Sequence, residues 1–385
     1  MFLPILLIIW LLAVFAQSEL LFGIVWSLLG MYIVFRLWVG RNAASMRISR
    51  QMPSRAYTGG QIQIETHVRN TGILPMLWAE VDDSLPPGLG TTPPRPQVLS
   101  LGAHGKEWLR YELTCKQRGY YHFGPLRVRC GDPLGLSERS FEAGEPGFLI
   151  VYPRVVSLRR LGLPTHSALV ALPARAPLFE DPASLVGVRD YLPTDSLRRI
   201  HWTATARTGH LMVKEFRHAT ARTTMICLDF QRRDYKVQER ERAMELAIVV
   251  AASIASHVVS RERLPVGLRI EGHDPLAGDL QTMHVPPGSN APHLMMILEL
   301  LARVQSAGDG DFADALRDEG RNLQWGSTVV AISGSQSEVL GEALAYLQKC
   351  GHAVALILVN PDPVARGVAR VPVYRVWDDK DLAAV

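Results

Sequence analysis

TTMICLDF, residues Thr223–Phe230, is an unbroken apolar run that ends at Asp229. Strands buried inside parallel sheets have this composition. Three runs of the same kind follow in the chain: Val266–Ile270, Ser327–Ser333 and Ala353–Val359. Helical stretches separate and follow them: Glu239–Ser260, Asn290–Gln305 and Gln336–Cys350. The alternation predicts a doubly wound, mostly parallel α/β (Rossmann-type) sheet over residues 222–378.

Ligands of such sheets bind beyond the carboxyl ends of the strands, which is where Asp229 and Ser333 fall. The chain has neither G-x-G-x-x-G nor G-x-x-x-x-G-K-S/T, so a nucleotide would lack its usual phosphate cradle. The twelve His form no H-E-x-x-H pattern and no cluster with Cys, so zinc is not expected either. We therefore predict no cofactor.

Working back toward the N-terminus, residues 2–39 are almost wholly apolar. Phe2–Ala16 and Leu20–Val39 are separated by a short polar stretch that contains Glu19, and a span needs about 20 residues. A transmembrane helical hairpin over residues 1–40, contacting the bilayer through residues 2–39, is the favoured interpretation. The alternative is a signal peptide cleaved after Ala16, although no basic residue precedes the apolar run.

Charge predicts the orientation of this hairpin. Arg36 lies near the end of the second run, the four arginines Arg41, Arg47, Arg50 and Arg55 follow it, and no Lys or Arg precedes the first run. The positive-inside rule then places the soluble domains in the cytosol and the chain in the inner (cytoplasmic) membrane. A cytosolic body agrees with four Cys that lack a Cys-x-x-Cys pair and are expected to be reduced and buried.

Residues 53–152 are predicted to form an all-β domain of the immunoglobulin-like sandwich type. Gln61–Arg69 alternates apolar and polar side chains, as a half-buried strand does, and a turn at Asn70 follows it. Further strands are expected at Leu77–Asp82, Trp108–Cys115 and Leu126–Cys130. We place a turn at Arg118–Tyr121, and we expect Tyr120, Tyr121 and Phe123 to pack rather than to bind a ligand.

A connector, residues 153–221, carries a basic segment, Gly187–Arg217, with six basic and three acidic side chains. A short helix capped near Asp195 would turn Ile200 and Trp202 inward. Three interpretations stay open for it: an Arg/Asp network that holds the segment in place, a surface for phosphate or an acidic partner, and an acid–base pair of His201 with Asp195.

Composition narrows the function classes. The chain has 385 residues, 48% of them hydrophobic, and a net charge of +4 from 41 basic and 37 acidic residues. This excludes a disordered chain and gives no strong signal for nucleic acid. Four Cys are too few for a disulfide scaffold.

The segment Gly187–Trp202, GVRDYLPTDSLRRIHW, resembles the DUF58 signature G-x-R-x-Y-x-x-G-D-x-x-R-x-I-x-W. ATARTG at Ala204–Gly209 continues it, and Thr194 stands where the family usually has Gly. Shorter resemblances to the family are Arg118–Tyr120, Gly124–Leu126, Asp132–Leu136 and Val151–Pro153.

The resemblance implies a von Willebrand factor A-like C-terminal domain. Intact domains of that kind bind a divalent metal through D-x-S-x-S, but here Gln231 and Arg233 follow Asp229 in place of the two Ser. We predict a degenerate site without bound metal, with Arg232 and Arg233 neutralising Asp229.

The resemblance also implies a partner. The family is often encoded beside MoxR-type AAA+ ATPases, so we expect a non-enzymatic, membrane-anchored adaptor that helps such an ATPase and other proteins of the same operon in protein assembly or maturation. The candidate contacts are Arg189, Asp195, Arg198, Arg199, Trp202 and Arg207. Two alternatives stay open: a membrane protein that only organises its operon's products, and an envelope-associated hydrolase that uses Asp195, His201 or Ser333.

Overall fold

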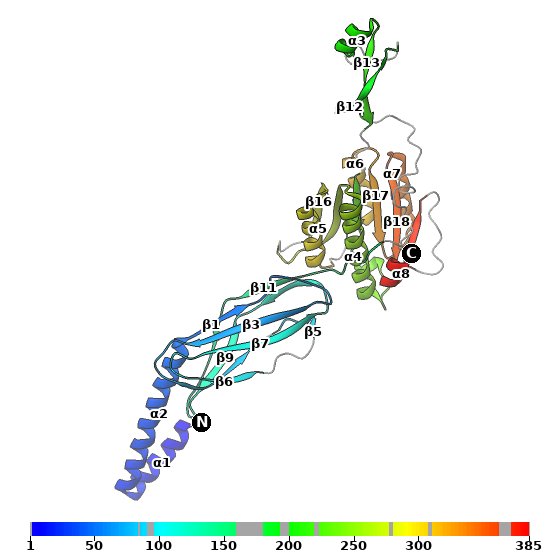
Figure 1. Ribbon diagram of the computed structural model, residues 1–385. Helices are drawn as coiled ribbons and strands as arrows, with labels where there is room; N and C mark the ends of the chain where they lie inside the picture. Colours follow the sequence, from blue (N-terminus) through cyan, green and yellow to red (C-terminus); the bar gives the residue numbers. More distant parts are fainter. Residues whose placement is uncertain are drawn as a thin grey trace. The chain divides into compact units, whose positions relative to one another are not determined.

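The computed structural model describes residues 2–83, 85–90, 96–158, 180–192, 200–218, 223–276, 280–306, 310–361 and 371–384. The chain is a mixed helix-and-sheet protein with several β-sheets and an apolar N-terminal helix (Figure 1). It divides into two compact units, residues 1–154 and 155–385.

Two antiparallel helices begin the chain, α1 (Phe2–Ala16) and α2 (Glu19–Ser45). The tight turn between them is possible because Gln17 adopts a positive φ of 48°. Among the described residues, α2 is long and apolar enough to cross a membrane, whereas α1 is shorter. Residues 240–262 also pass this test of length and composition, but that helix is mostly buried in the second unit, as a core helix is.

Three sheets make up the rest of the first unit, in the strand orders β1-β3-β7-β5, β10-β9-β4-β6 and β2-β11-β8. Their strands are β1 (Met46–Gln51), β2 (Arg55–Tyr57), β3 (Gln61–Asn70), β4 (Met76–Asp82), β5 (Leu89–Gly90), β6 (Gln97–Leu101), β7 (Lys106–Cys115), β8 (Gly119–Phe123), β9 (Leu126–Gly131), β10 (Glu138–Ala143) and β11 (Gly147–Tyr152). Every second side chain of β3 points inward, into one of two apolar clusters. Val68 lies in the cluster shared with β4, β6 and β9, and Ile64 lies in the cluster shared with β2, β8 and β11. The period-2 pattern of β3 therefore serves two cores at once.

The turn predicted at Arg118–Tyr121 is wrong. Gly119–Phe123 forms β8 and pairs with β11, because Tyr121 and Phe123 face the core while Tyr120 stacks on Phe148 at a centroid distance of 6.0 Å. The packing role expected for these aromatic side chains is confirmed.

Helix α2 runs directly into the first unit. Val39 is buried in an apolar cluster with β-strand residues, and Trp38 Nε1 and Asn42 Nδ2 each donate a 3.0 Å hydrogen bond to the carbonyl oxygen of Pro75. Strand β1 begins at Met46, the residue after the helix. The last two turns of α2 are thus held by the folded unit and belong to it.

The second unit contains a six-stranded sheet in the order β16-β15-β14-β17-β18-β19, parallel except for edge strand β16. Its strands are β14 (Thr224–Leu228), β15 (Val266–His273), β16 (Leu280–Gly288), β17 (Thr328–Ser333), β18 (Ala353–Val359) and β19 (Val373–Val376). The helices are α4 (Arg240–His257), α5 (Ala291–Arg303), α6 (Phe312–Asn322), α7 (Glu338–Lys349) and α8 (Asp379–Ala384). A π-type segment, Val258–Glu262, extends α4.

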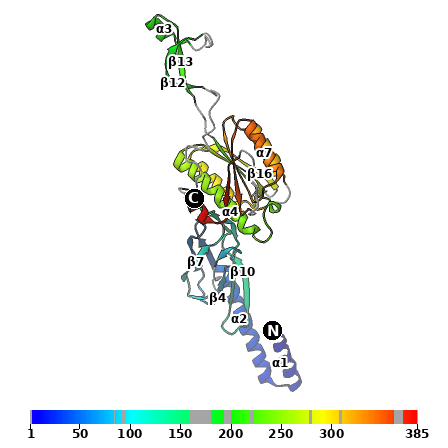
Figure 2. The same ribbon diagram turned by 90° about the vertical axis from the view of Figure 1, so that its right-hand side faces the viewer.

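Helices lie on both faces of this sheet, and Figure 2 shows α4 and α7 on opposite sides. Helices α6 and α7 pack on the sheet face to which Met225 and Cys227 of β14 point. Ile226, which lies between these two residues, points to the opposite face, where α4 packs. Because the chain leaves β14 toward β15 and later returns beside it as β17, the strand order reverses between β14 and β17. That reversal is where ligands of such sheets usually bind.

A small separate hairpin is formed by β12 (Glu180–Asp190) and β13 (Met212–His218), with α3 (Trp202–Thr208) between them. Ile200 and Val213 are buried and pair across it.

Candidate functional site

Asp229 and Ser333 meet at the point where the strand order reverses. Asp229 follows β14 and is 2% exposed, and Ser333 ends β17 and is 1% exposed. The Ser333 hydroxyl donates a 2.7 Å hydrogen bond to Asp229 Oδ2, and the Gln231 backbone N–H donates to Oδ1 at 3.2 Å. The structure thus brings together two side chains that the sequence placed 104 positions apart.

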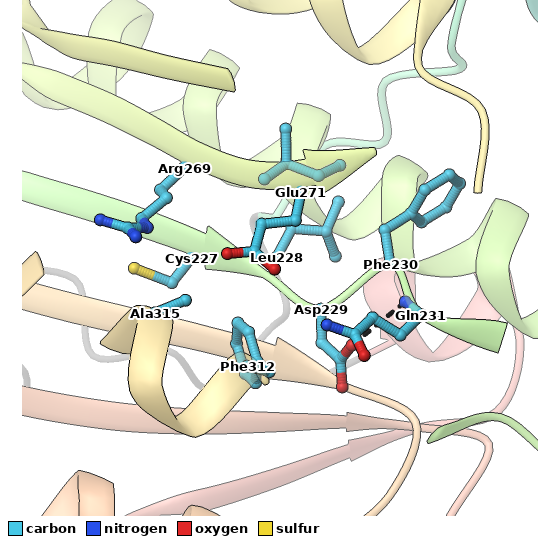
Figure 3. Close-up of a pocket in the computed structure, with 10 residues that line it drawn as sticks. Cys227, Leu228, Asp229, Phe230, Gln231, Arg269, Glu271, Phe312 and Ala315 are labelled. Atoms are coloured by element: carbon cyan, nitrogen blue, oxygen red, sulfur yellow. Dashed lines mark hydrogen bonds between the residues drawn. The ribbon is translucent and has the colours of Figure 1, made fainter. Parts of the chain in front are cut away.

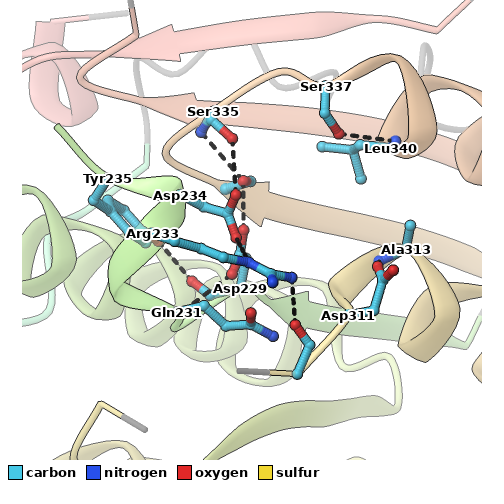
Figure 4. A network of polar contacts seen from close by, with 12 residues as sticks. Asp229, Gln231, Arg233, Asp234, Tyr235, Asp311, Ala313, Ser335, Ser337 and Leu340 are labelled. Carbon is cyan, nitrogen blue, oxygen red and sulfur yellow. Dashed lines mark hydrogen bonds and ion pairs between the residues drawn. The ribbon is translucent and has the colours of Figure 1, made fainter. Parts of the chain in front are cut away.

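A second carboxylate lies close to the first, as Figure 4 shows. Asp234 Oδ1 accepts a 3.3 Å hydrogen bond from the Ser335 hydroxyl, and its Oδ2 lies 3.6 Å from Arg233 Nε. Tyr235 packs beside this network, and its hydroxyl donates a 2.6 Å hydrogen bond to the carbonyl oxygen of Asp229. The result is a polar cluster held by two strand ends and one 3-10 turn, Arg232–Asp234. Its members are Asp229, Gln231, Arg233, Asp234, Tyr235, Ser333 and Ser335.

Burial, together with the charge of Asp234, raises the pKa of Asp229 to about 7, although the hydrogen bonds from Ser333 and Gln231 and the charge of Arg233 act in the opposite direction. Removing a carboxylate from water disfavours its ionised form, and two donors do not fully compensate. Near neutral pH, Asp229 therefore exists in both protonation states.

A small pocket opens beside Asp229 (Figure 3), and its polar lining comes from Asp229, Gln231, Arg269 and Glu271. Burial also raises the pKa of Glu271, opposed by Arg269 and reinforced by Asp311. The loop before α6 passes so closely that a Cβ on Gly310 would lie 2.1 Å from Glu271 Oε2 and 2.7 Å from Gln231 Nε2. Only glycine fits there without displacing both side chains.

The residues of the predicted degenerate site do not fit a divalent metal. Gln231 is buried with its Oε1 unbonded among the described residues, and Arg233 donates to the carbonyl oxygen of Gly310. In the described part of the chain, no group of three or more His, Cys, Asp or Glu side chains could hold a metal ion. The guanidinium group of Arg233 lies beside the cluster and supplies a positive charge there.

The two arginines expected to neutralise Asp229 have other main partners. Arg232 Nη2 binds Glu241 at 2.8 Å, and Arg233 binds Asp234 and Gly310. The hydroxyl of Ser333, and not an arginine, donates the side-chain hydrogen bond to Asp229. A buried carboxyl group needs a donor that is itself inside the sheet.

A buried ion pair lies farther inside, and sequence reasoning missed it. Glu319 on α6 is 2% exposed, accepts a 3.1 Å hydrogen bond from Arg269 and lies 3.2 Å from His284 Nε2. Strands β15 and β16 supply the two partners, and no spacing in the sequence links Arg269 or His284 to α6. Burial, reinforced by the charge of Glu319, raises the pKa of the nearby Cys227 thiol, so this cysteine is not a reactive thiolate.

The basic segment differs from its prediction in one respect. Trp202 is 69% exposed at the start of α3, not inward, whereas Ile200 is buried as predicted. His201 caps α3, its Nδ1 accepting the backbone N–H of Ala204 at 3.1 Å. This use of the imidazole as an acceptor is structural.

The remaining candidate contacts are partly placed. Arg207 is exposed in the last turn of α3, and Arg189 Nη1 on β12 donates to the carbonyl oxygen of Asp190. Asp195, Arg198 and Arg199 lie outside the described residues. His201 is engaged in a local hydrogen bond at the start of α3, whereas Ser333 bonds across the sheet to Asp229.

Comparison with known proteins adds the family. Residues 187–373 match the family described as "Protein of unknown function DUF58". These residues belong to the DUF58 family. The DUF58 region thus includes α3, Trp202 and the Asp229–Ser333 pair, whereas the shorter resemblances between Arg118 and Pro153 precede it.

One relative is "Uncharacterized protein YeaD" of Bacillus subtilis (strain 168), which is 28% identical over 281 residues. The match covers 68% of this chain and 66% of the relative, so the chain spans slightly less than two thirds of its length.

Solved structures match a smaller part of the chain. A CARDB domain from Pyrococcus furiosus, solved in complex with di-metal ions, is 16% identical and covers 28% of this chain and 86% of its own, with a TM-score of 0.21. One chain of the complex between zinc 2-glycoprotein and prolactin inducible protein from human seminal plasma is 9% identical. The match covers 27% of this chain and 93% of that chain, with a TM-score of 0.22.

Proposed function

We propose that this protein is a membrane-anchored, non-enzymatic adaptor. The hairpin of β12 and β13, together with the helix α3 between them, binds a protein partner. The observation that carries the proposal is Trp202, a large aromatic side chain with 69% of its surface exposed. Tryptophan and arginine are the residues that most often dominate binding energy at protein interfaces. Arg207 lies on the same short helix, and Leu192 and Leu211 are exposed beside the hairpin strands.

The charge of the segment favours an acidic surface as partner. Gly187–Arg217 carries six basic and three acidic side chains, and complementary charge speeds association and selects partners. A MoxR-type AAA+ ATPase is the partner that we propose, with other proteins of the same operon as further ones, in protein assembly or maturation.

The two units serve this role as scaffolds in our proposal. The second unit is a von Willebrand factor A-like domain that has lost its metal, and the polar cluster around Asp229 replaces the cation. The first unit is an immunoglobulin-like sandwich that holds the domain at the membrane. Helix α2 crosses the inner membrane, α1 completes the hairpin, and both units face the cytosol.

Catalysis by Ser333 is the less favoured alternative. A nucleophilic serine needs a base that takes its proton and a path to substrate. Ser333 is 1% exposed, and its hydroxyl donates to a carboxyl group that accepts a second hydrogen bond. The imidazole of His201 accepts a backbone hydrogen bond on another element.

Affinity capture from solubilised membranes tests the adaptor. The full chain should recover an AAA+ ATPase, and W202A combined with R207E should reduce the recovery by at least about tenfold, the effect of losing roughly 1.4 kcal/mol of binding energy. The matched control is W377A with R261E, because Trp377 is 48% exposed and Arg261 is exposed on the same unit.

Equal recovery by both double variants would reject α3 as the contact, and capture of no specific protein by the wild-type chain would reject the adaptor. The enzyme alternative predicts instead that S333A, in cells lacking the native gene, fails to restore function while partner capture is unchanged.

A further inference from the structure

The turn between β9 and β10 is unusually well braced for an exposed loop. Asp132 is 4% exposed, and its carboxylate accepts the backbone N–H groups of Leu134 at 2.9 Å, of Leu136 at 3.2 Å, and of Ser137. The Trp78 indole N–H donates to the carbonyl oxygen of Asp132 at 3.1 Å. Three donors on one carboxylate fix the backbone of the whole turn.

This rigid turn presents an apolar side chain to the outside. Leu134 is 59% exposed at its apex, and the next residue, Gly135, has a φ of +71° that lets the chain reverse. Ordering a loop so that it exposes a leucine has a cost in entropy and hydration, which a bound apolar environment would offset.

The turn lies beside α2. Strand β10 packs on α2, and Arg139 Nη1 is 3.5 Å from the position that a Cβ on Gly40 would occupy. Figures 1 and 2 both show the β9–β10 turn extending along α2 toward the start of α1. Because α1 and α2 are antiparallel neighbours, α1 starts at the end of the helix pair that faces the β-sheets of the first unit.

A second exposed apolar tip lies at the same end of the first unit. Ile73 is 78% exposed in the loop after β3. That loop is fastened to α2 through Pro75, and Asn70 Nδ2 donates to the carbonyl oxygens of Leu74 at 2.8 Å and of Gly102 at 3.0 Å. Exposed Arg41 and Arg139 flank the junction, where cations can meet lipid phosphate.

We propose that Ile73 and Leu134 insert into the headgroup region of the bilayer that α2 crosses, so that the first unit sits directly on the lipid surface. The inference rests on the proposed anchoring by α2. Continuity with α2 identifies lipid as the occupant, because any surface beside the emerging span meets headgroups before it meets a protein. Asp132 and Asn70 act as positioning residues that hold the two tips at one level.

Quenching by nitroxide-labelled lipid tests this on the full chain in vesicles of phosphatidylcholine and phosphatidylglycerol. The variants L134C and I73C carry an environment-sensitive fluorophore at their one accessible cysteine in a C350S background, since Cys115, Cys130 and Cys227 are buried. K116C is the control at the opposite end of the unit, next to the Gly59 turn, and I33C reports on the span itself.

We expect lipid carrying the nitroxide near the headgroup to quench the labels at positions 134, 73 and 33, and to leave the label at position 116 unchanged. R139E should reduce quenching at position 134 in vesicles rich in phosphatidylglycerol and leave it unchanged in neutral vesicles. Quenching at position 33 without quenching at 134 and 73 would overturn the lipid contact and leave the anchor intact.

Absence of quenching at position 33 would overturn the anchoring and the contact together. Labels at 134 and 73 that become shielded only after a soluble protein is added would assign the two tips to a protein partner instead, which also contradicts the proposal.

Discussion

Asp229 shows how burial and a like-charged neighbour set the properties of one carboxyl group. Its pKa is raised to about 7 from an ordinary value of 3.8, so the folded protein binds this proton more tightly than the unfolded chain does. The stability that this group contributes is complete below the unfolded pKa and is lost as the pH rises through about 7.

The second unit should therefore lose stability on the order of 2 kcal/mol between about pH 5 and about pH 8, and D229N should lose much less. The urea midpoint can be read from the accessibility of the buried Cys227 thiol in a short alkylation pulse of fixed pH. D234N is the matched control, because it removes the like charge and should move the transition to lower pH. A wild-type profile that matches D229N would contradict the raised pKa.

At this scale the sequence predicted the places of Asp229 and Ser333, because each follows an apolar run that can only be a buried strand. It did not predict that their side chains bond to each other, since the register between β14 and β17 depends on the whole sheet. Ile200 and Trp202 were both predicted to face inward from a short helix capped near Asp195. Ile200 is buried and pairs with Val213, whereas α3 begins at Trp202 and leaves its side chain exposed.

At the scale of elements, the Asn70 side chain forms four hydrogen bonds that hold neighbouring segments of the first unit together. Its Nδ2 binds two carbonyl oxygens, and its Oδ1 accepts the Gly72 N–H at 2.9 Å and the Ser45 hydroxyl at 3.1 Å. It is fully buried and joins the loop after β3 to the end of α2.

N70D is nearly isosteric, but it replaces the Nδ2 donor with a carboxylate oxygen that faces the carbonyl oxygens of Leu74 and Gly102. We therefore expect it to destabilise the first unit by about 2–4 kcal/mol. Urea unfolding followed through the buried Cys130 measures the change. N322D, at an exposed amide on α6, should have little effect on the same measurement. A loss at position 70 no greater than at 322 would contradict the clamp.

Elements with strong internal signals were predictable. Ala353–Val359 and β18 coincide, and β14, β15 and β17 begin or end within three residues of prediction. Strands β1, β2 and β8 were missed because they are short, or polar, or begin with a glycine that is typical of turns. Helix α6, FADALRDEGRN, was missed because it is short and its buried face has only Phe312 and Leu316 as large apolar residues.

For the whole molecule, the sequence predicted the division into an N-terminal apolar segment, a β-rich part and an α/β part. The boundary between the compact units falls at residues 154 and 155, near the predicted end of the β domain. Which side of a membrane the units occupy depends on charge flanking α2, and the fold alone carries no such information.

The proposed orientation gives a testable expectation. A C-terminal epitope tag on the full chain should resist protease added to intact spheroplasts and should be digested after the inner membrane is opened. A tag inserted after Gln17, in the turn between α1 and α2, should behave in the opposite way. Digestion of the C-terminal tag in intact spheroplasts would reverse the topology.

Helix α2 continues into β1 without a linker, and this continuity has a mechanical consequence. A helix that passes straight into a sheet, with Trp38 and Asn42 fastened to Pro75, acts as a lever arm. A tilt imposed on the apolar end, by a thicker bilayer or a neighbouring span, would swing the attached unit through the same angle. Membrane thickness would thereby become a variable that the soluble part of the chain can sense.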